Sequence, residues 1–417
     1  MSKHLLSFVS AASLVLQWLV LHWSGVHLTP PLEALASGAA IFGAAFLLSW
    51  AAELAQLDIP RGVAIAGLAV VAVLPEYAVD LYLAWQAAED PTYIGYATAN
   101  MTGANRLLIG VGWASLVLVA WVRSRGAQRE ITLAPSHSVE LWYLFLATVY
   151  AFTIPLKGTL TLADSAVLLT IFGFYARALL RQPVEPPHLV GPPVLVASLS
   201  TPLRRGVTLG LFLYSALGIL VAAEPFAESL ISTGSRLAIP EYLLIQWVAP
   251  LASESPELIV ATLFVLRGAA TAGLGMLLSS KVNQWTLLVG ALPLAYGISG
   301  GQPDAMPLDG LQVKEIFLTA AQSALGLAIL VSFALSIPAA TLLFVLFTAQ
   351  LLTQLVSEIF PGLSTGFPEF VEVAGYGFAY AYLLLAIVYL VGSRKSRLFS
   401  LFRLPAEAEK IGRVREW

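Results

Sequence analysis

The chain has 417 residues, of which 58% are apolar and 11% charged, and it carries a net charge of −3 and no cysteine. Soluble domains hold about 25% charged residues and fewer apolar ones, so the mean hydropathy of +0.81 indicates lipid as the solvent. The lack of cysteine excludes disulfides, thiolate metal sites, iron–sulfur clusters and cysteine nucleophiles. No phosphate-binding glycine loop occurs and the charge is nearly balanced, so neither a nucleotide nor a nucleic acid is an expected partner.

About twelve segments are long and apolar enough to cross a bilayer, which takes about 20 residues each. Their predicted limits are 5–22, 31–55, 60–88, 93–122, 138–156, 160–181, 206–233, 240–267, 270–299, 313–334, 337–358 and 370–392. We interpret the first as a retained helix rather than a signal peptide, because no A-x-A cleavage site follows it. Basic residues after the spans ending at 122, 181 and 392 are expected in the cytoplasm. This predicts a multi-pass protein of the plasma membrane with both termini cytoplasmic.

An internal repeat links the first and second parts of the chain. The stretch L-P-E-Y-A-V-D at 74–80 is matched by S-P-E-L-I-V-A at 255–261, and N-R-L-L-I-G-V-G at 105–112 by N-Q-W-T-L-L-V-G at 283–290. The offset stays near 180 residues. The two proline–glutamate spans cross in opposite directions, which is typical of inverted-topology repeats with a binding site at their interface near mid-membrane.

The repeat gives the predicted domain organisation. Its parts are an extra N-terminal helix (1–30), a first half (31–181), a cytoplasmic linker (182–205), a second half (206–358), and an extra helix with a cytoplasmic tail (359–417). The two extra helices are expected either to form a homodimer contact or to cover the core.

Two acidic residues lie deep inside apolar spans at equivalent repeat positions. Inserting a carboxylate there costs about 2.5–3.5 kcal/mol of free energy. The presence of Glu76 and Glu257 therefore indicates a functional role rather than chance. Each follows a proline, and Pro75 and Pro256 leave the carbonyl groups one turn before them without a helical donor. Carboxylate and carbonyl oxygens are the ligands that hard cations such as Ca²⁺ or Na⁺ prefer. The pattern therefore predicts a cation site.

Further polar residues accompany this pair. On the partner helices, Thr102 and Arg106 share one face, as do Ser280 and Gln284. The hydroxyl groups could instead bond back to their own helix. Ser253 is a further candidate, and we assign Asp80 and Glu254 either to the site or to an outer vestibule. Lys281 is expected to snorkel or to pair with a carboxylate, and Asn105 is expected to tie helices together.

These motifs resemble the sodium/calcium exchanger family of the cation/calcium exchanger superfamily. The segments V-A-V-L-P-E at 71–76 and A-S-E-S-P-E at 252–257 are similar to its G-T-S-x-P-E motif, although the first has lost both hydroxyls and Glu254 replaces one in the second. The resemblance covers about 31–358. It implies an all-α membrane protein of two inverted five-helix repeats, here with one extra helix at each end and about twelve transmembrane helices.

The resemblance also implies roles for individual residues. Acidic and hydroxyl side chains on four helices bind Na⁺ and Ca²⁺ in alternation, which carries over to Glu76 and Glu257 as central metal ligands. Ser253, Ser280 and Thr102 then supply hydroxyl oxygens. Gln284 stands where the family has an acid, and Arg106 where it has asparagine. A rival register matches G-A-N at 103–105 to the family's G-S-N and puts Leu108 at the asparagine position.

The predicted function is secondary antiport of Ca²⁺, or another cation, against Na⁺ or H⁺, with no cofactor and with lipid and small inorganic cations as partners. Arg106 would repel a cation 4 Å away by about 4 kcal/mol, so we expect it to stand in for one co-transported ion. An alternative is a transport-inactive scaffold in which Arg106 pairs permanently with Glu76 or Glu257. An intramembrane enzyme is disfavoured, because the histidines lie outside the spans or at their ends and the chain has no cysteine.

Overall fold

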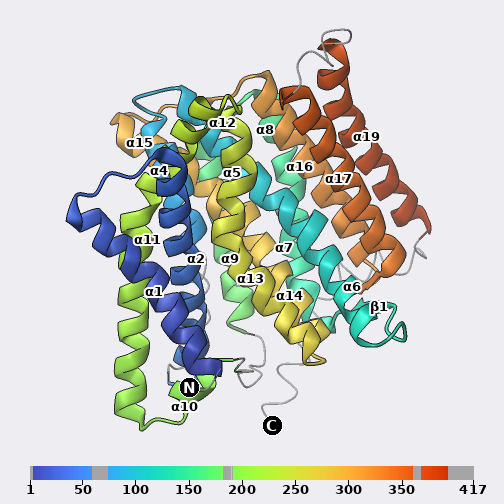
Figure 1. The fold of residues 1–417 in the computed structure, drawn as a ribbon. Coiled ribbons are helices and arrows are strands. Elements are labelled where there is room, and N and C mark those ends of the chain that lie inside the picture. The colour runs from blue at the N-terminus through green and yellow to red at the C-terminus, as the bar shows by residue number, and fades with distance from the viewer. Residues whose placement is uncertain (1–2, 59–73, 182–188, 190, 360–367, 393–417) are drawn as a thin grey trace. The chain divides into compact units, whose positions relative to one another are not determined.

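The computed structural model describes residues 3–58, 74–181, 189, 191–359 and 368–392 (Figure 1). The chain divides into two compact units, of which unit 1 comprises Met1–Leu83 and Pro183–Val260, and unit 2 comprises Ala84–Gln182 and Ala261–Trp417. Each unit thus draws on both predicted repeat halves. The half boundaries themselves stay a prediction, since the compact units cut across them.

Unit 1 is built from long apolar helices. Its elements are α1 (Lys3–Ser24), α2 (Pro30–Ala55), most of α4 (Leu74–Gln86), α10 (Pro193–Ala197), α11 (Thr201–Leu237), α12 (Glu241–Leu243), the π-helical turn η3 (Leu244–Val248) and the start of α13 (Ala249–Leu266). Helix α2 packs against both α11 and α1. A proline in the first turn of α2 and of α11 costs little there, because those N–H groups have no helical acceptor.

Small residues let these three helices approach closely. A Cβ atom at Gly218 of α11 would lie 2.5 Å from Val15 of α1, and one at Gly43 of α2 would lie 2.6 Å from the Ala11 carbonyl. Glycine at such contacts is typical of helix packing in membranes. At the end of α2, Asp58 accepts hydrogen bonds of 2.7 and 2.8 Å from Arg204, and these lower the pKa of its carboxyl group.

Unit 2 contains the remaining elements. They are the end of α4, α5 (Thr92–Leu107), η1 (Leu108–Trp113), α6 (Ala114–Arg123), β1 (Glu130–Thr132), η2 (Pro135–His137), α7 (Ser138–Ala151), α8 (Thr153–Lys157), β2 (Thr159–Leu160), α9 (Leu162–Leu179), the end of α13, α14 (Ala270–Asn283), η4 (Gln284–Leu288), α15 (Val289–Gly300), β3 (Met306–Pro307), α16 (Gly310–Leu330), β4 (Ala334–Ser336), α17 (Ile337–Ile359) and α19 (Pro368–Gly392).

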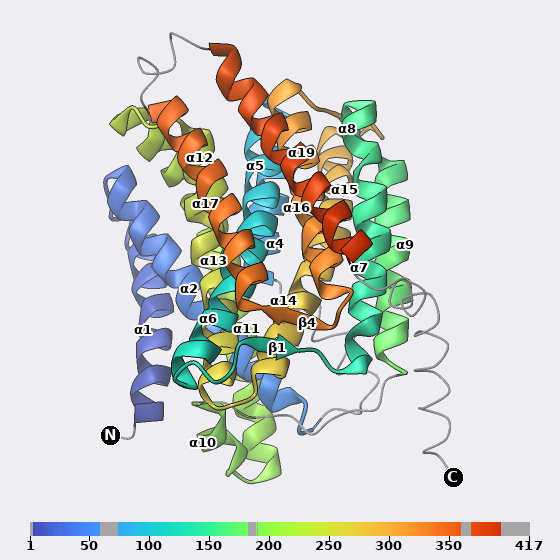
Figure 2. The same ribbon diagram turned by 90° about the vertical axis from the view of Figure 1, so that its right-hand side faces the viewer.

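Capping and short strands fix the loops of unit 2. Helices α9 and α16 each begin with a capping box, made by Thr161 with Asp164 and by Asp309 with Gln312. Strand β1 pairs antiparallel with β4, and β2 with β3. Helices α16, α17 and α19 lie side by side, with α19 in contact with both of the others (Figure 2).

The all-helical, multi-span fold class is confirmed. Among the described residues, ten helices are long and apolar enough to cross a membrane. Of the twelve predicted spans, 60–88 lies partly outside the described residues. The span 270–299 is helical throughout, as α14, η4 and α15, but is not one of those ten.

Candidate cation-binding site

Helix α4 carries two buried carboxylates in unit 1. Glu76 is 3% exposed and Asp80 is 0% exposed. Their spacing of four places them on one face of the helix, one turn apart. The carbonyl group of Val71, which we expected Pro75 to release, lies outside the described residues. Burying two acids in a membrane segment is costly and supports a functional use of this face.

Helix α13 supplies the second set of candidates to the same unit. Ser253 and Glu254 are buried, at 5% and 1% exposure, whereas Glu257 is half-buried. The Ser253 hydroxyl donates to the carbonyl groups of Ala249 and Pro250 at 3.3 and 3.4 Å, so its hydrogen is used within the helix while its oxygen can still accept or coordinate. Unit 1 therefore contains five of the predicted site residues, on two helices that are related by the repeat.

Helices α5 and α14 hold the neutral candidates in unit 2. Thr102, Ser280 and Gln284 are all buried, with 0%, 4% and 0% exposure. The Thr102 hydroxyl donates to the Thr98 carbonyl at 2.7 Å, which is the local bond that the sequence left open. No hydrogen-bond partner for the Ser280 hydroxyl is found among the described residues. A buried hydroxyl of this kind is unusual and can be satisfied by a ligand.

Both of these helices pass into a π-helical turn at the candidate residues. The turn η1 begins two residues after Arg106, and η4 begins at Gln284. The two turns therefore occupy nearly equivalent repeat positions. Single π-turns inside α-helices are rare and occur frequently at functional sites, because they shift the backbone hydrogen-bond pattern. No sequence signal predicted them.

Arg106 forms an ion pair that the sequence analysis missed. Its Nη2 atom donates to Oε2 of Glu315 on α16, and the two side chains are 1% and 5% exposed. The Arg106 Nε donates to the Thr102 carbonyl at 3.3 Å, and the side-chain amide of Gln322 donates to the backbone carbonyl of Arg106 at 3.3 Å. Glu315 could have been noticed as an acid within the tenth predicted span. Because of Glu315, the charge of Arg106 is compensated within unit 2.

Lys281 lies beside the candidate ligands of α14 but does not snorkel, so that expectation is wrong. It is 0% exposed, and its Nζ donates to the Asn105 side chain at 2.6 Å and lies 4.5 Å from the centre of the Trp285 ring. The indole face and the amide oxygen stabilise the ammonium group in place of water. Asn105 thereby ties α5 to α14, as expected.

Within the part of the chain that the structure describes, no three acidic or histidine side chains form a group that could hold a metal ion. The predicted ligand set has two central glutamates, completed by hydroxyl, amide and backbone oxygens. Such mixed oxygen sets bind hard cations, with Ca²⁺ accepting six to eight oxygens in flexible geometry.

Comparison with known proteins places this arrangement in a family. Residues 33–181 and 207–356 each match the family model described as sodium/calcium exchanger protein. The chain belongs to this family. Together the two matches cover more than half of the chain, and they agree with the two repeats of the predicted fold class. No match is found among curated proteins.

Solved exchanger structures share the fold. A crystal structure of the H⁺/Ca²⁺ exchanger CAX is 40% identical to this chain, with a TM-score of 0.87, over 97% of this chain and 99% of that one. A structure of the sodium–calcium exchanger NCX_Mj soaked with 2.5 mM Na⁺ and 1 mM Sr²⁺ is 14% identical, with a TM-score of 0.53, over 78% and 98%. At that identity, the second likeness concerns the fold alone.

Proposed function

We propose that this chain is an antiporter that exchanges Ca²⁺ for H⁺ across the membrane, with Glu76 and Glu257 as the central ligands. The observation that carries the proposal is the set of four carboxylates on α4 and α13, in one compact unit and largely buried in membrane segments. Ser253 of the same unit adds a hydroxyl oxygen, while Thr102, Ser280 and Gln284 of unit 2 stay ligand candidates predicted from the sequence. Asp80 and Glu254 tune its charge.

The charge of the buried groups favours a divalent cation. Glu315 cancels Arg106, so the guanidinium is not left to neutralise a cargo glutamate. Within unit 1, the two central glutamates contribute a charge of −2, and Asp80 with Glu254 brings the sum to −4. A site with net negative charge binds Ca²⁺ when the gradient is favourable, and its carboxylates accept protons when the ion leaves.

The coupling ion is proposed from the 40% identity to a structure described as an H⁺/Ca²⁺ exchanger. The Na⁺ alternative, which the family description also allows, stays an outcome of the test. No covalent chemistry is required, so the protein acts as a transporter rather than an enzyme and needs no cofactor. We place it in the plasma membrane with both termini in the cytoplasm, in contact with lipid and small cations, and the homodimer stays a proposal.

Uptake of ⁴⁵Ca²⁺ into proteoliposomes tests the function. Vesicles carry either a pH gradient or a Na⁺ gradient, and wild type is compared with Glu257→Gln. We expect uptake that depends on the pH gradient, is collapsed by a protonophore and is lost in Glu257→Gln. Uptake that depends on the Na⁺ gradient alone would identify Na⁺ instead of H⁺ as the coupling ion. Absence of uptake under both gradients would contradict antiport.

The scaffold alternative requires Arg106 to be bound to a cargo glutamate. The Arg106–Glu315 pair gives the guanidinium another partner and so weakens this alternative. The scaffold alternative predicts that the wild-type protein does not transport Ca²⁺ and that Arg106→Asn gains transport. The antiporter proposal predicts the opposite, an active wild type and no gain in the variant.

A further inference from the structure

A small polar pocket lies beside the Arg106–Glu315 pair, lined by residues of α16, α17 and α19 of unit 2. Its volume is about 30 Å³, and a buried water needs about 10–15 Å³ on this scale, so it holds about two water molecules. Its polar lining consists of Arg106, Lys314, Glu315, Gln350, Thr353, Gln354 and Glu358. None of these residues belongs to the predicted cation-ligand set.

Gln350 is the clearest sign that the pocket binds something. It is only 5% exposed, and neither its amide nitrogen nor its amide oxygen has a hydrogen-bond partner among the described residues. A buried amide that lacks both bonds costs several kcal/mol in lipid, so a ligand with donor and acceptor groups is expected on it. Water is the smallest molecule that supplies both.

The lining charges identify the ligand class. Arg106 and Lys314 balance Glu315 and Glu358, so the pocket has no net charge with which to select a cation or an anion. The lining part of α19 adds Gly375 and Phe378, which carry no charge. A neutral, polar space of this size suits water rather than an ion with its hydration shell.

A polar face on α17 connects the pocket to the end of that helix. Gln350, Gln354 and Glu358 follow one another at intervals of four and therefore lie on one face, one turn apart. Glu358 is exposed, and Gln354 is half-buried. Polar residues inside a membrane segment are expensive unless they line a hydrated space. The inner end of this face reaches the buried Arg106–Glu315 ion pair. Water there would reduce the desolvation penalty of the two buried charges.

We propose that this pocket is a water-filled inlet that runs from Glu358 along α17 to the Arg106–Glu315 pair, and that protons enter unit 2 through it during exchange. The proton role rests on the proposed H⁺/Ca²⁺ antiport. Each water accepts a proton on its oxygen and passes on one of its own, so the waters are not consumed. At the inner end the carboxylate of Glu315 accepts the transferred proton, because the guanidinium of Arg106 already carries its full set of protons. It is separate from the carboxylate set of unit 1, which takes the Ca²⁺.

Cysteine labelling tests the water directly, because the chain has no cysteine of its own. Thr353→Cys and Gln354→Cys would be exposed in proteoliposomes to hydroxyl radicals generated by radiolysis of water, which form from bound water in place and need no room for a bulky reagent. Leu352→Cys and Val356→Cys are matched controls, since these apolar positions on the same helix are exposed on its outer surface. We expect labelling at the lining positions at least tenfold faster than at the controls. Equal or absent labelling at the lining positions would overturn the inlet.

Transport assays then test the proton role. Gln350→Leu removes both amide groups and should dry the pocket. We expect it to slow ⁴⁵Ca²⁺ uptake driven by a pH gradient at least fivefold, while exchange of ⁴⁵Ca²⁺ for unlabelled Ca²⁺, which moves no net proton, stays near wild type. Thr353→Val serves as a second variant if the first does not fold.

The outcomes separate this inference from the proposed function. An equal loss in both assays, or a loss in neither, would overturn the proton role. Failure of wild type in both assays would instead contradict the antiport itself, while the labelling result would still decide whether the inlet holds water.

Discussion

The two compact units carry buried charge of different kinds. In unit 1, the buried charged side chains among the described residues are acids, namely Glu76, Asp80 and Glu254. Unit 2 contains both buried basic side chains that the structure describes, Arg106 and Lys281. There, each base has a neighbour in the same unit, Glu315 for the arginine and Asn105 with Trp285 for the lysine.

This difference suggests a division of labour. A buried charge with a matched partner needs no further ligand and is costly to leave alone, whereas a surplus of one sign attracts a partner of the other. We therefore assign cargo binding mainly to the acids of unit 1, and structural support to the paired charges of unit 2. Substitutions of the unit 1 acids should mainly reduce transport and leave stability unchanged, whereas substitutions of the paired bases of unit 2 or of their partners should mainly reduce stability.

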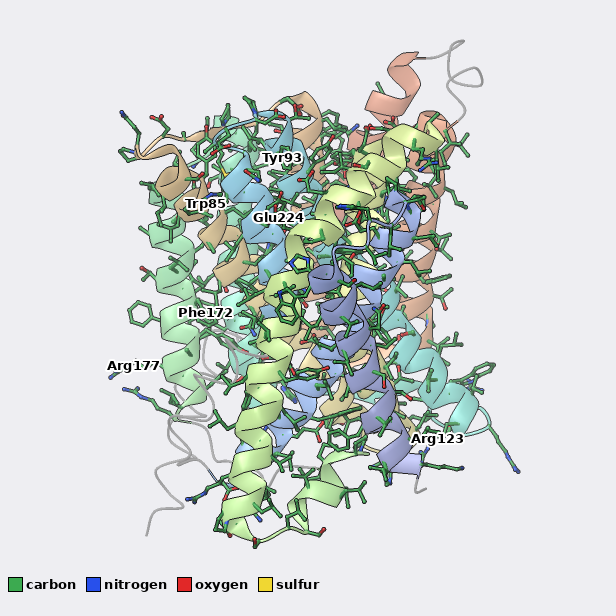
Figure 3. All side chains as sticks on the ribbon, turned by 60° about the vertical axis from the view of Figure 1, so that its left-hand side comes forward. Trp85, Tyr93, Arg123, Phe172, Arg177 and Glu224 are labelled. Atoms are coloured by element: carbon green, nitrogen blue, oxygen red, sulfur yellow. The ribbon has the colours of Figure 1, made fainter. Side chains whose placement is uncertain are left out.

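The largest effect is expected for Glu76→Gln. It removes a central ligand and a negative charge, so Ca²⁺ affinity should fall by about 100-fold, comparable to the loss of a strong metal contact. Thermal unfolding in detergent should change little. The control is Glu224→Gln, which alters an exposed acid on α11 of the same unit (labelled in Figure 3). Equal effects of the two variants on ⁴⁵Ca²⁺ binding would contradict the assignment of cargo binding to the buried acids of unit 1.

Glu315→Gln should mainly affect stability. Removing one partner of a buried ion pair leaves Arg106 uncompensated and costs about 3–5 kcal/mol of unfolding free energy. The double variant Arg106→Gln/Glu315→Gln should regain most of that loss. Denaturant unfolding in micelles measures both. A single variant as stable as wild type would show that the pair has no structural role.

A smaller loss is expected where η1 packs against α17. A Cβ atom at Gly110 would lie 2.3 Å from the ring of Phe347, so Gly110→Ala should cost about 1–3 kcal/mol through overpacking. Gly173→Ala on α9 is the control, because nothing lies within 4 Å of its added Cβ and alanine favours the helix by about 0.5–1 kcal/mol. Melting temperatures that shift in the same direction would contradict close packing at η1.

The smallest effect concerns the Asp58–Arg204 pair of unit 1. Hydrogen bonds from Arg204 lower the pKa of Asp58, so its contribution is complete above about pH 4 and is lost as the pH falls through the lowered value. Asp58→Asn should cost up to about 1 kcal/mol at pH 7, with the difference narrowing at pH 3. Asp304→Asn, at an exposed loop acid, is the control. A difference that is constant with pH would contradict the ion pair.

The sequence alone predicted the fold class, because apolar length and matched polar landmarks are local features. The Pro-Glu pairs at 75–76 and 256–257 sufficed to suggest the family that the comparisons show. Spans such as 138–156 and 337–358 correspond to helices of nearly the same limits. The ligand roles of Glu76, Glu257 and the neutral residues stay predictions.

The partners of the buried bases could not be predicted. Arg106 and Glu315 are 209 positions apart, and helical periodicity does not tell which distant helix a side chain meets. Lys281 was expected either to snorkel, as long basic side chains often do, or to pair with a carboxylate, whereas the structure buries it against the Asn105 side chain. The π-helical turns likewise depend on packing rather than on a local signal.

The most direct test of the central claim is the proton release that accompanies Ca²⁺ binding. Purified protein in weakly buffered detergent solution would be titrated with Ca²⁺ while the pH is recorded, for wild type and for Glu76→Gln/Glu257→Gln. We predict that wild type releases protons in proportion to the Ca²⁺ bound, and that the double variant neither binds Ca²⁺ nor releases protons. Binding of Ca²⁺ by wild type with no proton release, or undiminished release by the double variant, would contradict the account.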